Sequence, residues 1–249
     1  MRNRPARAPR FHLDAELRSG ARAALPEHAA HHALRVLRLR PGDEIVLFDG
    51  LGGEYQGVLA AAGRGGLAAE VGAWRDIERE SPLAAILVQG ISSGERMDLT
   101  IQKAVELGAT AIQPVFTERS VVRLAAERAR NRLEHWRRVA IAACEQCGRN
   151  RLPAVRAPLA LAEYCARPDD ASLRLLLAPE AKAALRDSVG CMKSTVALAA
   201  GPESGFTAAE EAMLAAAGFV AVRLGARVLR TETAALAALA ALNALAGDY

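Results

Sequence analysis

The sequence predicts an α/β protein with a parallel sheet, preceded by a small β-barrel domain. Before residue 75, short apolar stretches alternate with glycine-bearing turns, which is the pattern of short strands. From residue 83 onward, continuous apolar stretches alternate with helical patterns, which favours parallel strands covered by helices on both faces. A charged link at 76–82 ends in proline and separates the two patterns. We therefore place the domains at 1–75 and 83–249.

The N-terminal domain carries signals for four strands and one helix. In chain order these are a strand at 11–13, a helix at 28–37, and strands at 44–49, 54–59 and 67–71. Asp49-Gly50 and Gly52-Gly53 lie between the second and third strands, and such pairs favour a tight hairpin turn. Short strands joined in this way are typical of a small barrel.

The C-terminal domain alternates strands with helices along its whole length. We expect strands at 83–88, 110–116, 173–177, 195–200 and 219–224, and helices at 97–107, 125–148 and 234–245. Thr207-Ala-Ala-Glu210 forms a capping box, which predicts a further helix between the last two strands. This alternation predicts that the strands are parallel.

The charge of the chain is uneven. The net charge is +4, and the first forty residues hold nine arginines against three acidic residues. A basic segment of this kind is typical of proteins that bind nucleic-acid phosphates. No apolar stretch follows the arginines as it would in a secretory signal, and none is long enough to span a bilayer. We therefore expect a soluble, cytoplasmic protein with no membrane partner.

The four cysteines predict no metal site. Cys144 and Cys147 have the spacing of a metal or redox pair, but both fall within the helix expected at 125–148. Cys165 and Cys191 do not supply the second pair that a structural zinc site requires. We interpret these side chains as small buried groups.

Two glycine-bearing loops follow the last two predicted strands. The first is Gly201-Pro202-Glu203-Ser204-Gly205-Phe206, and the second is Leu224-Gly225-Ala226-Arg227-Val228-Leu229-Arg230-Thr231-Glu232-Thr233-Ala234. Open α/β sheets bind ligands outside the carboxyl ends of their strands, so we expect the loops to form two walls of one pocket. The dinucleotide fingerprint and the Walker A motif are both missing, which argues against dehydrogenases, NTPases and Rossmann-type methyltransferases.

Both loops resemble those of the SPOUT class of S-adenosylmethionine (SAM) methyltransferases, above all the bacterial 16S rRNA uracil-N3 methyltransferase family. That family has a Gly-Pro-Glu-Gly-Gly-Phe-like loop, from which Ser204 departs, and a Leu-Gly-x-Arg-Ile/Val-Leu-Arg-x-Glu-Thr-Ala segment, which is matched throughout. The pattern around His28, Arg38, Gly50 and Tyr55 also resembles the family's PUA-like RNA-binding domain. The resemblance implies a SPOUT-type parallel sheet with a C-terminal trefoil knot, preceded by a PUA-like β-barrel.

The resemblance also implies how the pocket is used. SAM lies bent in the knot and is held largely by main-chain groups of three loops. The corresponding cofactor-binding residues are Leu177, Ala178, Gly201, Glu203, Gly205, Leu224, Gly225, Val228 and Leu229. Methyl transfer to uracil N3 requires loss of a proton, and a nearby cation stabilises the resulting anion. We expect Arg230, Glu232 and Glu203 to be catalytic; an ion-pair network that braces the fold is the alternative reading of these charges.

The partners follow from the same resemblance. It implies 16S rRNA, bound within the small ribosomal subunit, and a homodimer formed through the knot domain. The expected RNA-binding residues are Arg10, Arg35, Arg38, Arg119, Arg149 and Arg151. The apolar helix at 234–245, with Leu236, Leu239, Leu242 and Leu245, is the expected dimer interface. Two alternatives stay open: a SPOUT methyltransferase acting on another RNA nucleotide, and a non-catalytic RNA-binding ribosome assembly factor, which Ser204 would favour.

Overall fold

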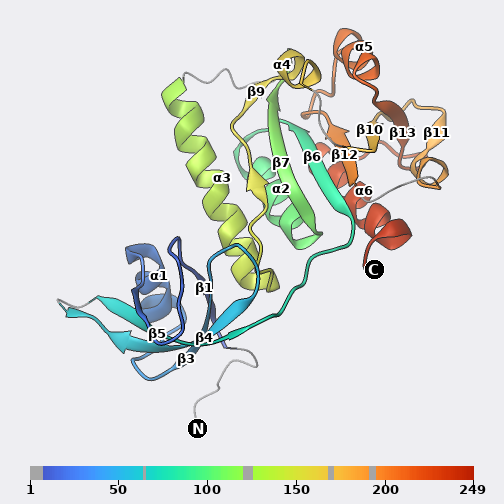
Figure 1. Ribbon diagram of the computed structural model, residues 1–249. Coiled ribbons are helices and arrows are strands. Elements are labelled where there is room, and N and C mark those ends of the chain that lie inside the picture. The colour runs from blue at the N-terminus through green and yellow to red at the C-terminus, as the bar shows by residue number, and fades with distance from the viewer. Residues whose placement is uncertain (1–7, 64–65, 120–125, 168–170, 191–194) are drawn as a thin grey trace. The chain divides into compact units, whose positions relative to one another are not determined.

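The computed structural model describes residues 8–63, 66–119, 126–167, 171–190 and 195–249 (Figure 1). Arg2, Arg4 and Arg7 of the basic segment, and Cys191, lie outside the described residues. The chain forms two compact units. The first consists of Met1–Glu80 with Cys144–Leu152, and the second of Ser81–Ala143 with Pro153–Tyr249. The domain limits at 1–75 and 83–249 remain proposed boundaries.

The first unit is built on a five-stranded sheet in the order β1-β3-β4-β5-β2. The strands are β1 (Arg10–His12), β2 (Arg22–Ala24), β3 (Glu44–Phe48), β4 (Glu54–Ala61) and β5 (Leu67–Arg75). Neighbours β3, β4 and β5 are antiparallel, as the hairpin turn predicts, whereas β1 joins β3 in parallel. The four predicted strands are confirmed. The sequence pattern missed β2, because three residues of Arg-Ala-Ala show no alternation of apolar and polar side chains.

The helix predicted at 28–37 forms in two parts. It begins as α1 (Glu27–His31) and continues as a π-helical turn, η1 (His32–Val36). Ala29 and Ala33 pack into the core of the unit with Phe11, Leu47 and Leu59. Arg38 follows the turn with a φ of 56°, the only positive φ among the described non-glycine residues.

The second unit contains an eight-stranded sheet in which every pairing is parallel, as predicted. Its order is β11-β13-β10-β12-β6-β7-β8, and β9 pairs with β7. The bounds are β6 (Ala84–Gly90), β7 (Ala109–Phe116), β8 (Ala154–Val155), β9 (Leu159–Ala160), β10 (Leu173–Leu177), β11 (Ala183–Ala184), β12 (Thr195–Ala200) and β13 (Val220–Arg223). Leu87 on β6 and Leu198 on β12 are completely buried in the middle of the sheet. Burial on both faces explains the continuous apolar stretches of the sequence.

The helices of this unit are α2 (Gly94–Glu106), α3 (Ala126–Cys147), α4 (Leu161–Cys165), α5 (Ala208–Ala216) and α6 (Thr231–Ala246), with a short 3-10 turn, η3 (Leu185–Ser188). The capping box of α5 is confirmed: the Glu210 N–H donates to the Thr207 hydroxyl, and the Thr207 N–H donates to the Glu210 carboxylate at 2.8 Å. The last residues of α3, from Cys144, belong to the first unit. Among the described residues, no helix has both the length and the apolar composition to cross a membrane.

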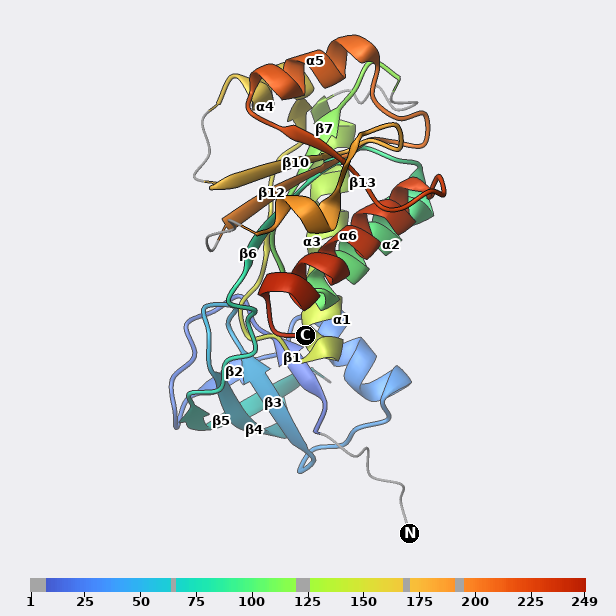
Figure 2. The ribbon, with the colours of Figure 1, turned by 90° about the vertical axis from the view of Figure 1, so that its right-hand side faces the viewer.

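The packing of α6 excludes two of the four leucines named for the expected dimer interface. Helices α2 and α6 lie side by side (Figure 2). Leu239 and Leu242 are completely buried within the chain, and the Asn243 side chain donates to the Leu107 carbonyl at 2.7 Å. The prediction that these two leucines meet a second subunit is therefore wrong, because they already pack inside their own. Leu245 remains 51% exposed.

After β13, the chain returns across the unit to α6, which contacts β12, β6 and η3. This return path accords with a knotted tail. The threading of the knot itself stays a prediction that the resemblance implies.

Candidate functional site

A cavity of about 610 Å³ lies where β10, β12 and β13 end. Its volume is in the range of small-molecule binding sites. The cavity wall includes all the residues that the motifs predict to hold a cofactor, namely Leu177, Ala178, Gly201, Glu203, Gly205, Leu224, Gly225, Val228 and Leu229. The structure therefore brings the three predicted loops together at the carboxyl edge of one parallel sheet.

The loop after β12 fits tightly against the end of β6. A Cβ atom on Gly90 would lie 2.6 Å from the Pro202 nitrogen, so no larger residue fits at this junction. Gly225 in the other loop has a φ of 84°, a conformation that glycine adopts without strain. Ser204 does not have a positive φ, and its hydroxyl donates to the Arg119 carbonyl at 3.4 Å. The serine is thus accommodated without backbone strain at the position where the resembling family has glycine.

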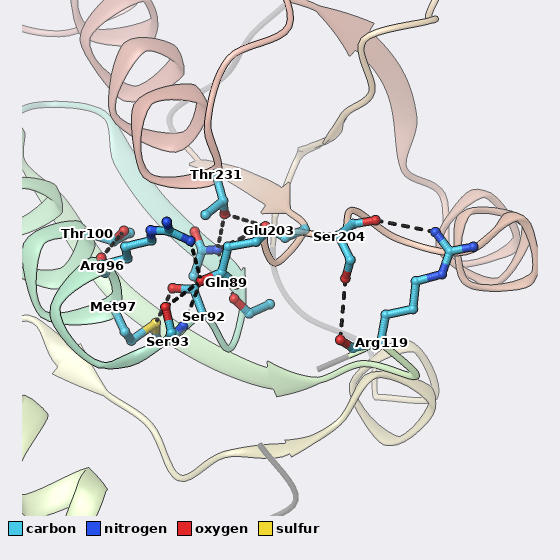
Figure 3. Close-up of polar contacts among 12 residues, drawn as sticks. Gln89, Ser92, Ser93, Arg96, Met97, Thr100, Arg119, Glu203, Ser204 and Thr231 are labelled. Atoms are coloured by element: carbon cyan, nitrogen blue, oxygen red, sulfur yellow. Dashed lines mark hydrogen bonds and ion pairs between the residues drawn. The ribbon is translucent and has the colours of Figure 1, made fainter. Parts of the chain in front are cut away.

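Glu203 is held by three hydrogen bonds at the edge of the cavity (Figure 3). Its Oε1 atom accepts from the Ser93 N–H at 2.9 Å, the Ser93 hydroxyl at 2.7 Å and Arg96 Nη1 at 3.0 Å. Burial raises the pKa of Glu203, but these donors outweigh it and lower the pKa to about 2. A carboxylate with so low a pKa is a weak base and is already paired, so Glu203 fits the alternative reading, a structural ion pair, better than proton transfer.

Gln89 lies under the same loop and was not predicted. Its side-chain amide is completely buried and donates to the Thr231 hydroxyl at 3.1 Å and to the Gly201 carbonyl at 3.3 Å. The Thr231 hydroxyl also donates to Gly201 O. Gln89 therefore joins the loop after β12 to the start of α6. The available signal was a polar side chain at the carboxyl end of a buried strand, beside Gly90.

Two arginines and one carboxylate remain unpaired in the cavity. Arg227 and Arg230 are exposed, and their guanidinium groups have no hydrogen-bond or ion-pair partner in the described part of the chain. Arg230 is the N-cap residue of α6, and Glu232 lies in the first turn of that helix. Glu232 Oε2 is buried and has no hydrogen-bond partner within the described ranges. The cavity thus offers free cations and one free carboxylate oxygen close together in the chain.

The predicted RNA-binding arginines fall into two groups. Arg35, Arg38, Arg119 and Arg151 are exposed; Arg151 also pairs with Glu78 at 2.6 Å, and Arg119 donates to the Ser204 carbonyl at 3.4 Å. Arg149 is buried in the first unit, and the Arg10 side chain is only 11% exposed there. The RNA-binding prediction is not supported for these two, because carboxylates inside the unit occupy their guanidinium groups.

These two arginines belong to an ion-pair network. Arg149 is 4% exposed, and its Nε donates to Glu80 at 2.8 Å. Arg10 pairs with Glu54 at 2.6 Å, and Arg79 pairs with the same carboxylate at 3.2 Å. Burial raises the pKa of Glu54, but the two arginines outweigh it and leave the pKa below its usual value. These charges hold the segment Cys144–Leu152 in the first unit.

Cys144 is also buried in this segment, within α3. Burial raises the pKa of its thiol to about 12. A thiol that resists ionisation is a poor metal ligand and a poor redox group, since both roles require the thiolate.

Known protein families account for both units. A family model described as "RNA methyltransferase domain" matches residues 79–243. A second model, described as "RNA methyltransferase PUA domain", matches residues 25–72. The chain belongs to the RNA methyltransferase family.

The sequences of several known proteins align with this RNA methyltransferase along most of its length. The ribosomal RNA small subunit methyltransferase E of Mycobacterium tuberculosis is 36% identical over 96% of this chain and 92% of its own. Its namesake from Bacillus subtilis is 32% identical over 86% of each chain. A solved structure of ribosomal RNA small subunit methyltransferase E from Neisseria gonorrhoeae, bound to SAM, is 41% identical with a TM-score of 0.89, and covers 98% of this chain and 100% of that one. The solved structure of a methyltransferase from Legionella pneumophila, also bound to SAM, is 36% identical with a TM-score of 0.93. It covers 98% of this chain and 100% of that one.

Proposed function

We propose that this RNA methyltransferase transfers a methyl group from SAM to N3 of a uracil in 16S rRNA. The similar proteins are named as methyltransferases of small-subunit ribosomal RNA, and two of the similar structures hold SAM. One observation carries the proposal: the residues predicted from the motifs to hold SAM line a single cavity together with Arg230 and Glu232.

The residues of the cavity fit SAM. Ala178, Gly201, Gly205 and Gly225 have small side chains or none, so a ligand can approach their main chain closely. Leu229 and the 76% exposed Val228 offer apolar surface for an adenine ring. When bound, SAM supplies a methyl group that a positively charged sulfur activates.

Arg230 and Glu232 are the groups that we assign to the chemistry. Uracil N3 carries a proton at neutral pH, and the carboxylate of Glu232, which lines the cavity, accepts it. The unpaired guanidinium of Arg230 stabilises the negative charge that remains on the base. The N3 electron pair then forms the bond to the methyl carbon, and the electrons of the broken carbon–sulfur bond stay on sulfur. Glu203 positions the pocket loop and takes no proton.

The RNA must present an unpaired base, because N3 lies on the Watson–Crick edge of uracil. We assign RNA contacts to the exposed side chains of Arg35, Arg38, Arg119 and Arg151. The substrate is 16S rRNA within the small ribosomal subunit, in the cytoplasm. The enzyme acts as a homodimer through its second unit, on a surface that excludes the buried leucines of α6.

The test is methylation of small ribosomal subunits purified from a strain that lacks the modification. With labelled SAM, we expect one methyl group at N3 of one 16S uracil, mapped by nuclease digestion and mass spectrometry. A methyl group on another nucleotide would identify a different target. Calorimetric titration with SAM is the companion measurement, and an absence of binding would leave only a role in ribosome assembly.

A further inference from the structure

Arg96 is a pocket residue that the motifs did not predict and that the proposed chemistry does not use. It lies in the first turn of α2, whereas the other described residues that line the cavity fall between Leu177 and Ala234. Its side chain is 45% exposed. A separate part of the chain therefore adds a cation to the wall of the cavity.

Glu203 fixes the direction of the Arg96 side chain (Figure 3). Arg96 Nη1 donates to Glu203 Oε1, and both hydrogen bonds from Ser93 anchor that same oxygen to the residue that precedes α2. Because the carboxylate is held on two sides, the guanidinium is ordered before any ligand arrives. An arginine that is already ordered loses less side-chain entropy on binding.

The opposite edge of the guanidinium remains free. Nε and Nη2 of Arg96 have no hydrogen-bond or ion-pair partner among the residues that the structure describes. By contrast, Arg223, which also lines the cavity, donates to the Lys182 carbonyl at 2.6 Å. Nε and Nη2 together form a planar fork with two parallel donors, which matches two oxygens of a phosphate group.

We propose that Arg96 binds a phosphate of the RNA strand that carries the target uracil. This inference rests on the proposed function. A base that leaves its stack brings the phosphate of its own backbone to the entrance of the pocket. The three loops assigned to SAM all lie between Leu177 and Leu229, and Arg96 on α2 belongs to none of them.

The experiment compares Arg96→Ala, Arg96→Lys and Arg96→Gln with the wild type. Arg137→Ala is the matched control, because Arg137 is an exposed arginine of α3 that pairs with Glu134 at 2.8 Å, outside the pocket. Small ribosomal subunits that lack the modification serve as the RNA probe. We measure the Kd for subunits between about 50 and 200 mM KCl, the Kd for SAM by calorimetry, and the melting temperature of each variant.

We expect Arg96→Ala to weaken subunit binding about tenfold, as the loss of a charge-assisted hydrogen bond would. The slope of log Kd against the logarithm of the salt concentration should decrease by about 1. Such a decrease corresponds to the release of one counterion fewer and indicates a lost phosphate contact. The Kd for SAM should not change. Arg96→Lys should restore the slope and part of the affinity, because it keeps the charge but not the fork. Arg137→Ala should match the wild type.

Weaker subunit binding with an unchanged salt slope would overturn the phosphate assignment, and weaker SAM binding would assign Arg96 to the carboxylate of the donor instead. If Arg96→Ala has a lower melting temperature than the wild type, Arg96→Gln replaces it in the binding measurements, because glutamine keeps a hydrogen-bond donor for Glu203. Normal methylation and an unchanged salt slope in Arg96→Ala and Arg96→Gln would refute the role of Arg96 but leave the proposed function standing. Wild-type protein that neither binds nor methylates subunits would refute the proposed function as well.

Discussion

Charged residues of the cavity divide into those that hold the structure and those that remain available to substrate. Oε1 of Glu203 accepts hydrogen bonds from Ser93 and Arg96. Arg230 and Glu232 Oε2, in contrast, have no partner in the described parts of the chain. A free charge beside a cavity is a candidate for ligand contact, because its interactions are still to be made.

Arg230→Ala tests this division directly. We expect kcat to fall by about a hundredfold or more, because the variant removes the charge that stabilises the uracil anion. The free energy of unfolding should change by less than about 0.5 kcal/mol, since the side chain is exposed and unpaired. Methylation assays and urea unfolding measure the two effects. Near-normal turnover by the folded variant would rule out this assignment.

The acid dependence of stability tests the role of Glu203. Its pKa is about 2 in the folded chain, against 4.5 for the free side chain. A lowered pKa stabilises the fold above about pH 4.5, and this contribution is lost as the pH falls toward about 2. The difference in melting temperature between wild type and Glu203→Gln should therefore be largest near neutral pH and shrink in acid. Glu70→Gln, at an exposed position of β5, is the control. A Glu203 difference that stays constant across this range would contradict the assignment.

At the scale of elements, helix α5 ties the pocket loop to the strand that follows α2. Its N-cap, Thr207, lies directly after the Gly201–Phe206 loop. Glu210 closes the capping box and also accepts a hydrogen bond from the Glu118 N–H at 2.7 Å, just beyond β7. The start of α5 thus orients the loop after β12 and the loop after β7 together.

Thr207→Ala measures what the cap contributes. We expect a loss of about 1 kcal/mol in the free energy of unfolding, because the Glu210 N–H loses its acceptor. Thr207→Ser retains the hydroxyl, so its free energy of unfolding should differ from that of the wild type by only about 0.3 kcal/mol, the usual difference between good N-cap residues. Denaturant unfolding of the two variants gives the comparison. Equal stability of both would show that the cap contributes nothing here.

At the scale of the whole molecule, the segment Cys144–Leu152 is separated in sequence from the rest of the unit to which it belongs. The chain completes most of α3 in the second unit before it contributes this segment to the first. Buried ion pairs of Arg149 with Glu80, and of Arg10 with Glu54, lie in that unit. Burying these charges is costly, so each depends on its partner.

Arg149→Ala should therefore destabilise the protein by about 3 kcal/mol or more, because it leaves the Glu80 carboxylate without its partner. Arg35→Ala, a matched substitution at an exposed arginine, should change stability by less than about 0.5 kcal/mol and weaken RNA binding instead. Thermal unfolding and subunit binding separate the two effects. Weakened RNA binding by a fully stable Arg149→Ala protein would restore the original RNA-binding prediction for Arg149.

The sequence alone determined the kind and order of the main elements and the two motif loops of the pocket wall. Strands β10 and β12 and the capping box of α5 are local patterns, and the two motif loops meet because parallel strands end at the same edge of a sheet. Two-residue strands such as β8 and β11 leave no periodic signal and were missed.

Only the tertiary structure decided what each charged side chain does. Arg96 pairs with Glu203 across 107 positions of sequence, and Arg149 pairs with Glu80 across 69. No local pattern encodes such pairs, since burial and distance between charges depend on the packing of the complete chain. For this reason the motifs placed their loops at one cavity, whereas the pairing of Glu203, Arg10 and Arg149 is seen only in the fold.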